Sequence, residues 1–384
     1  MTDPRQDPTI DLLSRLVAID SVNPSLVPGG AGEAGMASAL AEELASCGAK
    51  VEVTEAAPGR PNVLGTLEGR RPGPTLLFCG HVDTVGVAGM EAPFSPRIAD
   101  GKLYGRGAVD MKGGVAAMVG AARRIAETGG LPAGRLLISG VADEEHASLG
   151  AEAVARQVRA DAAVVTEPTG LEIAVGHKGF AWVEVTTHGR AAHGSRPREG
   201  VDAILHMGRF LARLAALDTA LQSRPPHPLL GTASLHASQI EGGRELSTYP
   251  ARCTLTLERR TLPQEPCELA AREVAALLRD LAGEDPAFRA ESRLLFGRPG
   301  YETPAACPLP DLLEKALERA GRPVRRGGTS FWTDAAVLGQ AGIPTVLFGP
   351  GGEGLHSREE YVWVEDVLAC RDVLAEVARE FCAG

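Results

Sequence analysis

The chain has 384 residues, of which 44% are hydrophobic and 23% are charged, as expected for a globular protein large enough for two domains. Its net charge of -10 excludes a general basic surface for nucleic acid, and no apolar stretch approaches the ~20 residues of a membrane span. Seven scattered cysteines without a CxxC motif, and a start that contains Asp and Pro, predict free thiols, no signal peptide and a cytoplasmic location.

The first part of the chain predicts alternating helices and strands. Residues 8–19 and 33–47 have the apolar spacing of amphipathic helices, and a helix rich in small residues is expected at 111–128. Buried strands are expected at the apolar runs 75–80, 136–142 and 162–166. This alternation is typical of an α/β layer with a mostly parallel sheet.

From about residue 176 the pattern changes. Strand-like runs at 179–189, 233–243, 252–260 and 288–296 are interrupted by helical runs at 200–217 and 268–283. The order β-α-β-β-α-β is that of a ferredoxin-like module. Afterwards a helix at 310–321 and a strand at 343–352 resume the α/β pattern. We therefore expect one discontinuous domain, residues 1–176 and 296–384, interrupted by an inserted α+β domain at 177–295.

Residues able to bind a metal follow the predicted buried strands or precede the small-residue helix: His81, Asp83, Asp110, Asp143, Glu144, Glu145, Glu167 and His356. Taken singly, each has an ordinary interpretation, such as a surface histidine, a solvated pair of glutamates or a helix N-cap. Ligands of open α/β folds, however, bind beyond the carboxyl ends of the strands, where these residues can converge. Two histidines and several carboxylates without cysteine suit Zn²⁺ or a similar divalent ion.

Other chemistries have little support in the sequence. The chain contains no GxxxxGK[ST] phosphate loop, no HExxH helix and no GxSxG elbow. The Gly-rich stretch 105–114 does not fit GxGxxG, because Asp110 falls where the third glycine would be. A serine hydrolase and a nucleotide-binding enzyme are therefore disfavoured.

Seven segments resemble, in the same order, the motifs of one family: GHVDTV (80–85), GRGAVDMKGG (105–114), DEEHASLGA (143–151), TEPT (166–169), GRAAHGSRP (189–197), ERRTLPQE (258–265) and LHSREEYV (355–362). This is the dinuclear-zinc amidohydrolase family of acetylornithine deacetylase, succinyl-diaminopimelate desuccinylase, aminoacylase and glutamate carboxypeptidase. The resemblance implies a zinc-peptidase-like catalytic domain built from both outer segments. It also implies that the insert is a lid, which usually dimerises in this family.

The resemblance implies two Zn²⁺ per chain, with Co²⁺ as an alternative. By the same resemblance Asp110 bridges the two ions, and His81 and Glu167 complete one site. Glu145 and His356 complete the other. The family also commonly has a cis peptide bond after the bridging aspartate.

Further roles are implied for residues beside the metals. Glu144 is the expected general base, and Asp83 is expected to hydrogen-bond the imidazole of His81 and so fix its tautomer. His193, in the insert, is expected to reach the carbonyl oxygen of the substrate, often from the partner subunit in this family.

Substrate recognition rests on two short segments. Arg260 matches a position that often binds a substrate carboxylate, for which a planar guanidinium is suited. Thr329 and Ser330 look like the carboxylate-binding loop of the family. The alternative for Arg260 is an exposed arginine at the end of a strand, an interpretation that suits the neighbouring Arg259 equally well. The alternative for Thr329 and Ser330 is an ordinary turn.

We expect a metal-dependent hydrolase that cleaves the amide bond of an N-acyl amino acid, acts as a homodimer and has no nucleic-acid or membrane partner. A dipeptidase or a glutamate-type carboxypeptidase is the alternative within the same chemistry. A metal-retaining protein without catalysis is the alternative from another class, which the presence of Glu144 disfavours because a binding protein needs no base.

Overall fold

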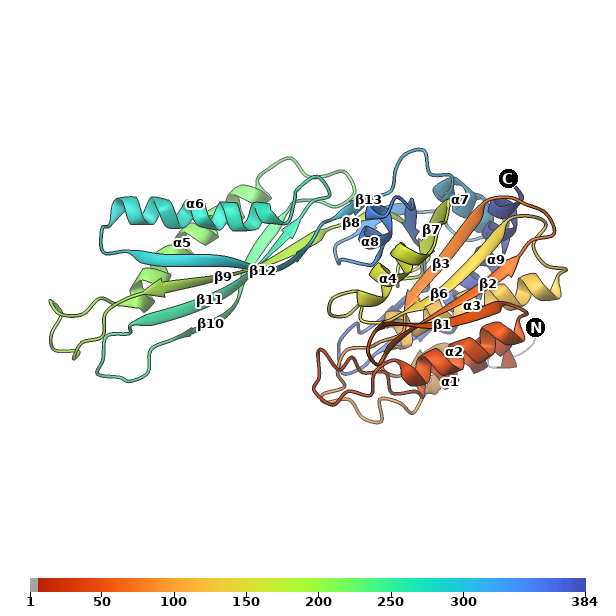
Figure 1. Ribbon diagram of the computed structural model, residues 1–384, viewed down its shortest axis with the longest axis horizontal. Helices are drawn as coiled ribbons and strands as arrows, with labels where there is room; N and C mark the ends of the chain where they lie inside the picture. The colour runs from red at the N-terminus through yellow and green to blue at the C-terminus, as the bar shows by residue number, and fades with distance from the viewer. Residues whose placement is uncertain (1–5) are drawn as a thin grey trace. The chain divides into compact units, whose positions relative to one another are not determined.

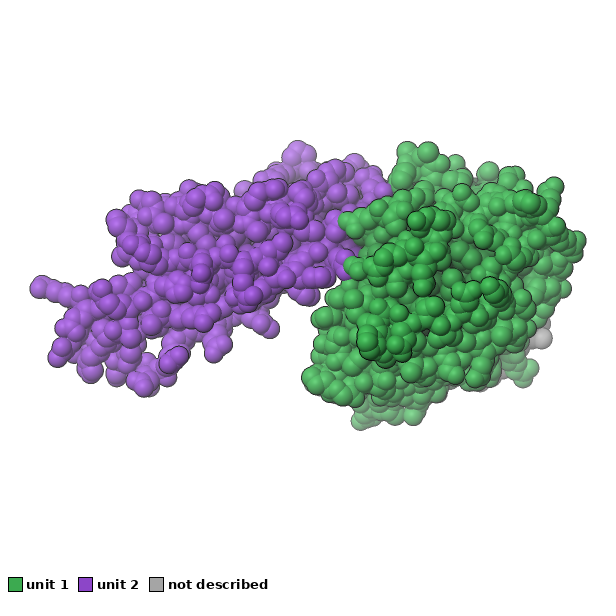
Figure 2. All heavy atoms as spheres, viewed as in Figure 1, with its two compact units in different colours: residues 1–175, 303–328, 333–384 green, residues 176–302, 329–332 purple. Residues whose placement is uncertain are grey.

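The computed structural model describes residues 6–384 (Figure 1). These residues form two compact units (Figure 2). Unit 1 contains the described residues up to Val175 together with Thr303–Gly328 and Thr333–Gly384. Unit 2 contains Gly176–Glu302 and the short segment Thr329–Trp332.

Unit 1 is built on a mixed sheet with a parallel centre. In sheet order its strands are β1 (Lys50–Ala57), β2 (Arg60–Glu68), β6 (Arg135–Val141), β3 (Thr75–His81), β7 (Ala162–Val165), β15 (Thr345–Leu347) and β8 (Ile173–His177). The pairs β3–β6, β3–β7 and β7–β15 are parallel, whereas β1, β2 and β8 pair antiparallel. Every residue of β3 is buried, as expected for a continuous apolar run at the centre of a sheet. The prediction of a mostly parallel core is confirmed.

Helices cover this sheet. They are α1 (Pro8–Val17), α2 (Ala34–Ser46), α3 (Gly113–Glu127), α4 (Leu149–Gln157), α7 (Leu309–Arg319), α8 (Ala335–Gln340) and α9 (Val364–Ala383). The small side chains of α3 let it pack closely against β3, α1 and α9, and most of its residues are buried. Within the described residues, no helix is long and apolar enough to cross a membrane.

A second, small sheet in unit 1 was not expected from the sequence. Its strands, in order, are β16 (Gly352–Glu353), β17 (Tyr361–Trp363), β5 (Lys102–Tyr104) and β4 (Arg97–Ala99). Strands of two or three residues are too short to show an alternating pattern. This sheet brings the late segment around His356 beside the short segment η2 (Ala108–Lys112), in which Asp110 and Met111 have non-helical backbone angles.

Unit 2 has the predicted ferredoxin-like order of elements. These are β9 (Gly179–His188), α5 (Ala203–Gln222), β10 (Ser234–Gly242), β11 (Arg252–Thr261), α6 (Glu268–Glu284) and β12 (Arg289–Arg298). The strands form an antiparallel sheet in the order β10-β11-β9-β12, and α5 and α6 pack on it (Figure 1). Two short strands, β13 (Tyr301–Glu302) and β14 (Arg326–Thr329), lie near the points where the chain passes between the units.

The close approach of α3 to the end of β7 gives a stability prediction. A Cβ added at Gly114 would lie 2.0 Å from the backbone oxygen of Thr166, which cannot move aside without displacing Glu167. Gly114→Ala is therefore expected to lower the free energy of unfolding by about 1–3 kcal/mol, as overpacking does elsewhere. Urea unfolding followed by circular dichroism measures this change.

Gly208 in α5 is the matched control. A Cβ there would meet no atom within 4 Å, so Gly208→Ala is expected to leave stability unchanged or raise it by up to about 1 kcal/mol. Equal stabilities of the Gly114→Ala variant and the wild type would contradict the close packing of α3.

Candidate metal centre

Three neighbouring strands of unit 1 end at the same edge of the sheet and carry the predicted site. His81 is the last residue of β3, Glu144 and Glu145 follow β6, and Glu167 follows β7. Because these strands run parallel, their carboxyl ends meet. One ligand atom each from His81, Glu144 and Glu167 lies within 4.8 Å of the others, and the same holds for His81, Asp110 and Glu145.

The two oxygens of Asp110 face two different imidazoles. Oδ1 lies 3.0 Å from Nε2 of His81, and Oδ2 lies 3.2 Å from Nε2 of His356. The imidazole of His356 also lies 3.2 Å from Oε2 of Glu145. Asp110 therefore stands between two groups of ligand-type atoms, and the peptide bond that follows it is cis. The structure thus places all five predicted metal ligands together, Glu167 included.

The pKa values show how concentrated the negative charge is. Burial raises the pKa values of Glu144 and Glu167 well above the usual range of a glutamate, and the neighbouring carboxylates raise them further. Hydrogen bonds to Asp110 and Glu145 raise the pKa of His356 to about 10. Burial opposes ionisation of Asp110, but its hydrogen bonds to His356 and His81 hold its pKa well below the usual range. Protons and divalent cations therefore compete for this cluster, since both neutralise it.

The donor atoms fit a divalent cation. Within the described part of the chain, the buried atoms Glu145 Oε1 and Glu167 Oε1 have no hydrogen-bond partner. Buried carboxylate oxygens without a partner are costly, and a bound cation would satisfy them. Carboxylate oxygens and imidazole nitrogens without thiolates are ligands that zinc and similar ions accept.

Asp83 contacts its neighbours differently from the prediction. Nδ1 of His81 lies 3.0 Å from the backbone oxygen of Asp83 but 3.6 Å from its carboxylate oxygen Oδ1. The backbone carbonyl is therefore the hydrogen-bond acceptor that leaves Nε2 facing Asp110. The Asp83 carboxylate instead accepts the backbone N–H groups of Glu144 and Glu145, each at 3.2 Å.

Glu360 was missed by the sequence reasoning, although it lies four residues after His356. Its buried carboxylate accepts the backbone N–H groups of Gly107, Val109 and Asp110 at 3.0–3.2 Å. It also accepts a hydrogen bond from the guanidinium of Arg106 at 2.6 Å. One carboxylate thus holds the turn that carries Asp110. The sequence did contain a signal that such a residue was needed, because the backbone N–H groups of a buried Gly-rich turn require a hydrogen-bond acceptor.

The remaining predicted residues belong to unit 2. His193 is exposed on the loop after β9, and its Nδ1 lies 2.8 Å from Oγ of Ser195. Arg260, at the end of β11, is partly exposed and donates to Oε1 of Glu258 at 2.5 Å. The hydroxyl of Thr329 donates to the carbonyl of Phe331 at 3.2 Å, and Ser330 is exposed beside it.

Arg259, the alternative to Arg260, is buried and fully engaged. Its guanidinium donates to the carboxylates of Glu265 and Glu273 at 3.1–3.4 Å and to the backbone oxygen of Arg260 at 2.6 Å. It therefore holds β11 against α6 and the turn after β11, and has no donor directed at a substrate.

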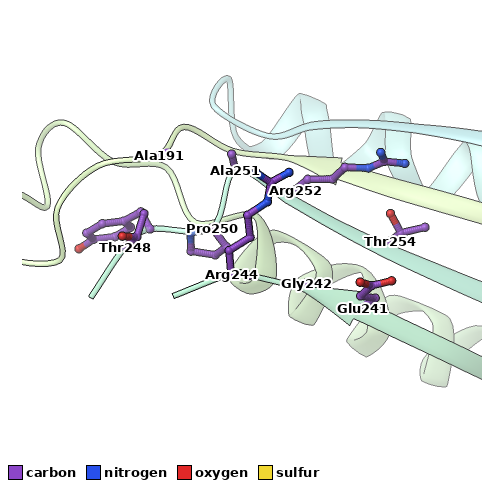
Figure 3. A pocket seen from close by; sticks show the side chains of 11 residues that line it. Ala191, Glu241, Gly242, Arg244, Thr248, Pro250, Ala251, Arg252 and Thr254 are labelled. Carbon is purple, nitrogen blue, oxygen red and sulfur yellow. The ribbon is translucent and has the colours of Figure 1, made fainter. Parts of the chain in front are cut away.

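Unit 2 also contains a separate hollow of about 550 Å³ near the end of β10 (Figure 3). Among the residues that line it are Ala191, Glu241, Arg244, Thr248 and Arg252. None of the predicted metal ligands lines this hollow, and the carboxylate cluster of unit 1 is a different site.

Comparisons with known proteins give a consistent assignment. The family model "Peptidase family M20/M25/M40" matches residues 77–380. The chain is 34% identical to an acetylornithine deacetylase of Myxococcus xanthus, with 80% of each chain covered. It is 30% identical to an acetylornithine deacetylase of Photorhabdus laumondii, with 98% of this chain and 97% of that protein covered.

Solved structures share the fold. A tripeptidase from Staphylococcus aureus superposes with a TM-score of 0.83 at 20% identity, covering 100% of this chain and 99% of that one. A dinuclear metal-binding M20 peptidase from Bacillus subtilis gives a TM-score of 0.74 at 16% identity, covering 98% of both chains. The family resemblance is confirmed: the chain belongs to peptidase family M20/M25/M40 and is a metal-dependent hydrolase of amide bonds.

Proposed function

We propose that this hydrolase removes the acyl group from an N-acyl amino acid, using two divalent metal ions held in unit 1. The observation that carries the proposal is the position of Asp110, whose two carboxylate oxygens face two imidazoles beside the partly buried Glu145 and the buried Glu167. The full-length similarity to acetylornithine deacetylases supports an N-acyl amino acid as the substrate.

The residues that would hold the ions follow from this arrangement. Asp110 would bind both ions, His81 and Glu167 would complete one site, and Glu145 and His356 would complete the other. Zinc is the proposed native metal, with cobalt as an alternative. Bound at these residues, the ions would supply a water of lowered pKa and polarise the carbonyl of the scissile amide.

Glu144 is the proposed general base. It lies in the cluster with His81 and Glu167, beside the proposed ligand Glu145, where its carboxylate would accept a proton from the attacking water. Glu144 would return this proton to the leaving amine. The Asp83 carboxylate accepts the N–H groups of the peptide bonds before and after the Glu144 Cα and so sets where the base lies.

Residues of unit 2 are proposed to bind the substrate. His193 would donate a hydrogen bond to the carbonyl oxygen as negative charge develops there. Arg260 would bind the free carboxylate of the substrate, exchanging its present contact with Glu258 for a second carboxylate. Thr329 and Ser330 supply hydroxyl groups for the same carboxylate.

Unit 2 is also the proposed site of dimerisation. In the described sheet β10 pairs only with β11, so the other edge of β10 has free backbone groups. Apolar side chains lie exposed beside it: Ile240 on β10, Leu205 on α5 and Leu246 on the next loop are 56%, 67% and 108% exposed. A second copy of the chain, related by a two-fold axis, pairs with this edge and covers these residues. The seven free cysteines support a reducing, cytoplasmic environment.

A hydrolysis panel tests the proposed substrate class. Protein loaded with zinc or cobalt is expected to release free amine from N-acetyl-ornithine or another N-acyl amino acid. The matched control is the methyl ester of the best substrate, whose turnover is expected to fall because Arg260 has no carboxylate to bind. Faster turnover of dipeptides with C-terminal Glu than of every N-acyl amino acid would instead establish a carboxypeptidase.

The base assignment is tested by Glu144→Gln. This change keeps the size of the side chain but removes the proton acceptor, so kcat is expected to fall by about 10²- to 10⁴-fold. Metal content, measured by mass spectrometry, is expected to stay unchanged. Glu127→Gln at the exposed end of α3 is the control and is expected to keep full activity. A Glu144→Gln variant with normal kcat would assign the base elsewhere.

Mixed dimers test both the dimer and the role of His193. If His193 acts in the site of the partner, mixing inactive Glu144→Gln and His193→Ala proteins produces dimers in which one site has both residues. Partial recovery of activity is therefore expected, and its extent is measured against separately incubated variants.

Ile240→Arg provides the control for this experiment. A charge on the free edge of β10 is expected to make the protein monomeric in sedimentation and to prevent recovery when both partners carry it. Subunit exchange without recovery would show that His193 acts within its own chain. A dimer that persists in Ile240→Arg would place the interface elsewhere.

A further inference from the structure

A buried polar network lies behind the loop that carries Glu144 and Glu145. Its five members come from separate segments of unit 1 and are each at most 7% exposed: Asn23, Glu33, Arg60, Asp83 and Asp143. Three of them are carboxylates and one is a cation. Except for Asp83, none has a place in the mechanism described above.

Arg60, the first residue of β2, is the cation of this network. Its Nε and Nη2 atoms form a bidentate pair with Glu33, at 2.8 and 2.5 Å. Nη2 also donates to Oδ1 of Asp143 at 2.8 Å, and Nη1 donates to Oγ of Ser25 at 2.9 Å. The guanidinium is thus fixed by Glu33 on one side and directed at Asp143 on the other.

Asn23 connects this ion pair to Asp83. Its side-chain nitrogen donates to Oδ2 of Asp83 at 2.7 Å and to Oδ1 of Asp143 at 3.1 Å. Its side-chain oxygen accepts from Arg60 Nη2 at 3.1 Å. The two carboxylates therefore share one amide, and the guanidinium lies beside it. Without a cation, two buried carboxylates this close would repel each other strongly.

The network holds the ligand loop from two directions. Asp143, directly before Glu144, has a left-handed backbone with φ of 70°, which is unfavourable for a residue other than glycine. Its backbone oxygen accepts the N–H groups of Ala147 and Ser148, at 3.0 and 2.6 Å, so the turn starts at this residue. Asp83 accepts the N–H groups of both glutamates that follow.

We propose that Arg60 is a positioning residue of the metal centre: through Asp143, Asn23 and Asp83 it fixes the backbone of Glu144 and Glu145. It touches neither metal ligands nor substrate, and Glu33 serves to orient it. This inference rests on the proposed function, which takes Glu144 as the general base and Glu145 as a metal ligand.

The test compares Arg60→Met and Arg60→Lys with the wild type. Zinc affinity is measured by competition with a chelator, and kcat is measured at saturating zinc. Arg60→Met is expected to weaken zinc binding and lower kcat by about 10- to 100-fold, the range seen when residues that orient metal ligands are removed. Arg60→Lys keeps the charge but not the planar fork, and is expected to recover part of both.

Arg371→Met is the matched control. Arg371 is also a mostly buried arginine of unit 1, and it pairs with Asp7 before α1 and with Asp372 on α9, at 2.6 and 2.7 Å. Its removal is expected to lower the Tm of the zinc-free protein while leaving zinc affinity and kcat unchanged. A role for Arg60 in stability alone predicts the same behaviour for Arg60→Met, and that result would overturn the proposal.

Asn23→Ala covers the case in which Arg60→Met does not fold. It keeps the pair of Arg60 with Glu33 but removes the amide between Asp143 and Asp83, and is expected to weaken zinc binding in the same direction. Wild-type zinc affinity in both Asn23→Ala and Arg60→Lys would also overturn the proposal. If the wild type hydrolyses no compound of the panel, the proposed function fails, whereas the zinc affinities still decide the role of Arg60.

Discussion

The fold of unit 1 is governed by the need to keep several carboxylates close together in a buried place. Asp110, Glu144, Glu145 and Glu167 gather at one edge of the sheet with two imidazoles. Such a group is stable only when positive charge is shared among its members, by protons or by divalent ions. The surrounding structure therefore holds the backbone of each ligand firmly. Glu360 binds the turn of Asp110, and Asp83 binds the loop of the two glutamates.

The positions of the site residues along the sequence explain why the site needs both segments of unit 1, before and after the insert. The proposed ligands run from His81 to His356, and unit 2 is inserted between Glu167 and the last of them. The parallel strands bring the earlier ligands together directly. The late histidine reaches them through the small sheet, in which β17 pairs with β5 just before the turn of Asp110.

Much of this arrangement was predictable because it follows from local patterns. The apolar runs of β3, β6 and β7 end in polar residues, and parallel strands align such ends. The ferredoxin-like order of unit 2 followed from alternation and helical spacing in the same way. The N–H groups of the Gly-rich turn indicated that an acceptor was needed, but not that Glu360 supplies it. The role of Arg60 was not predictable, since its partners come from distant segments and no spacing marks them. The hydrogen bond expected between His81 and the Asp83 carboxylate is not the one that forms. Nδ1 of His81 lies 3.0 Å from the carbonyl oxygen of Asp83 and 3.6 Å from its carboxylate, a difference that residue spacing does not reveal.

The carboxylate of Glu360 also bears on how the protein is made. During synthesis the turn of Asp110 emerges long before Glu360, and until then its N–H groups at Gly107, Val109 and Asp110 lack their acceptor. His356 emerges in the same late stretch. A ribosome-bound chain that ends before this stretch thus holds the early predicted ligands without the carboxylate that fixes the turn of Asp110. That turn can therefore gain its final hydrogen bonds only late in synthesis, together with the arrival of His356.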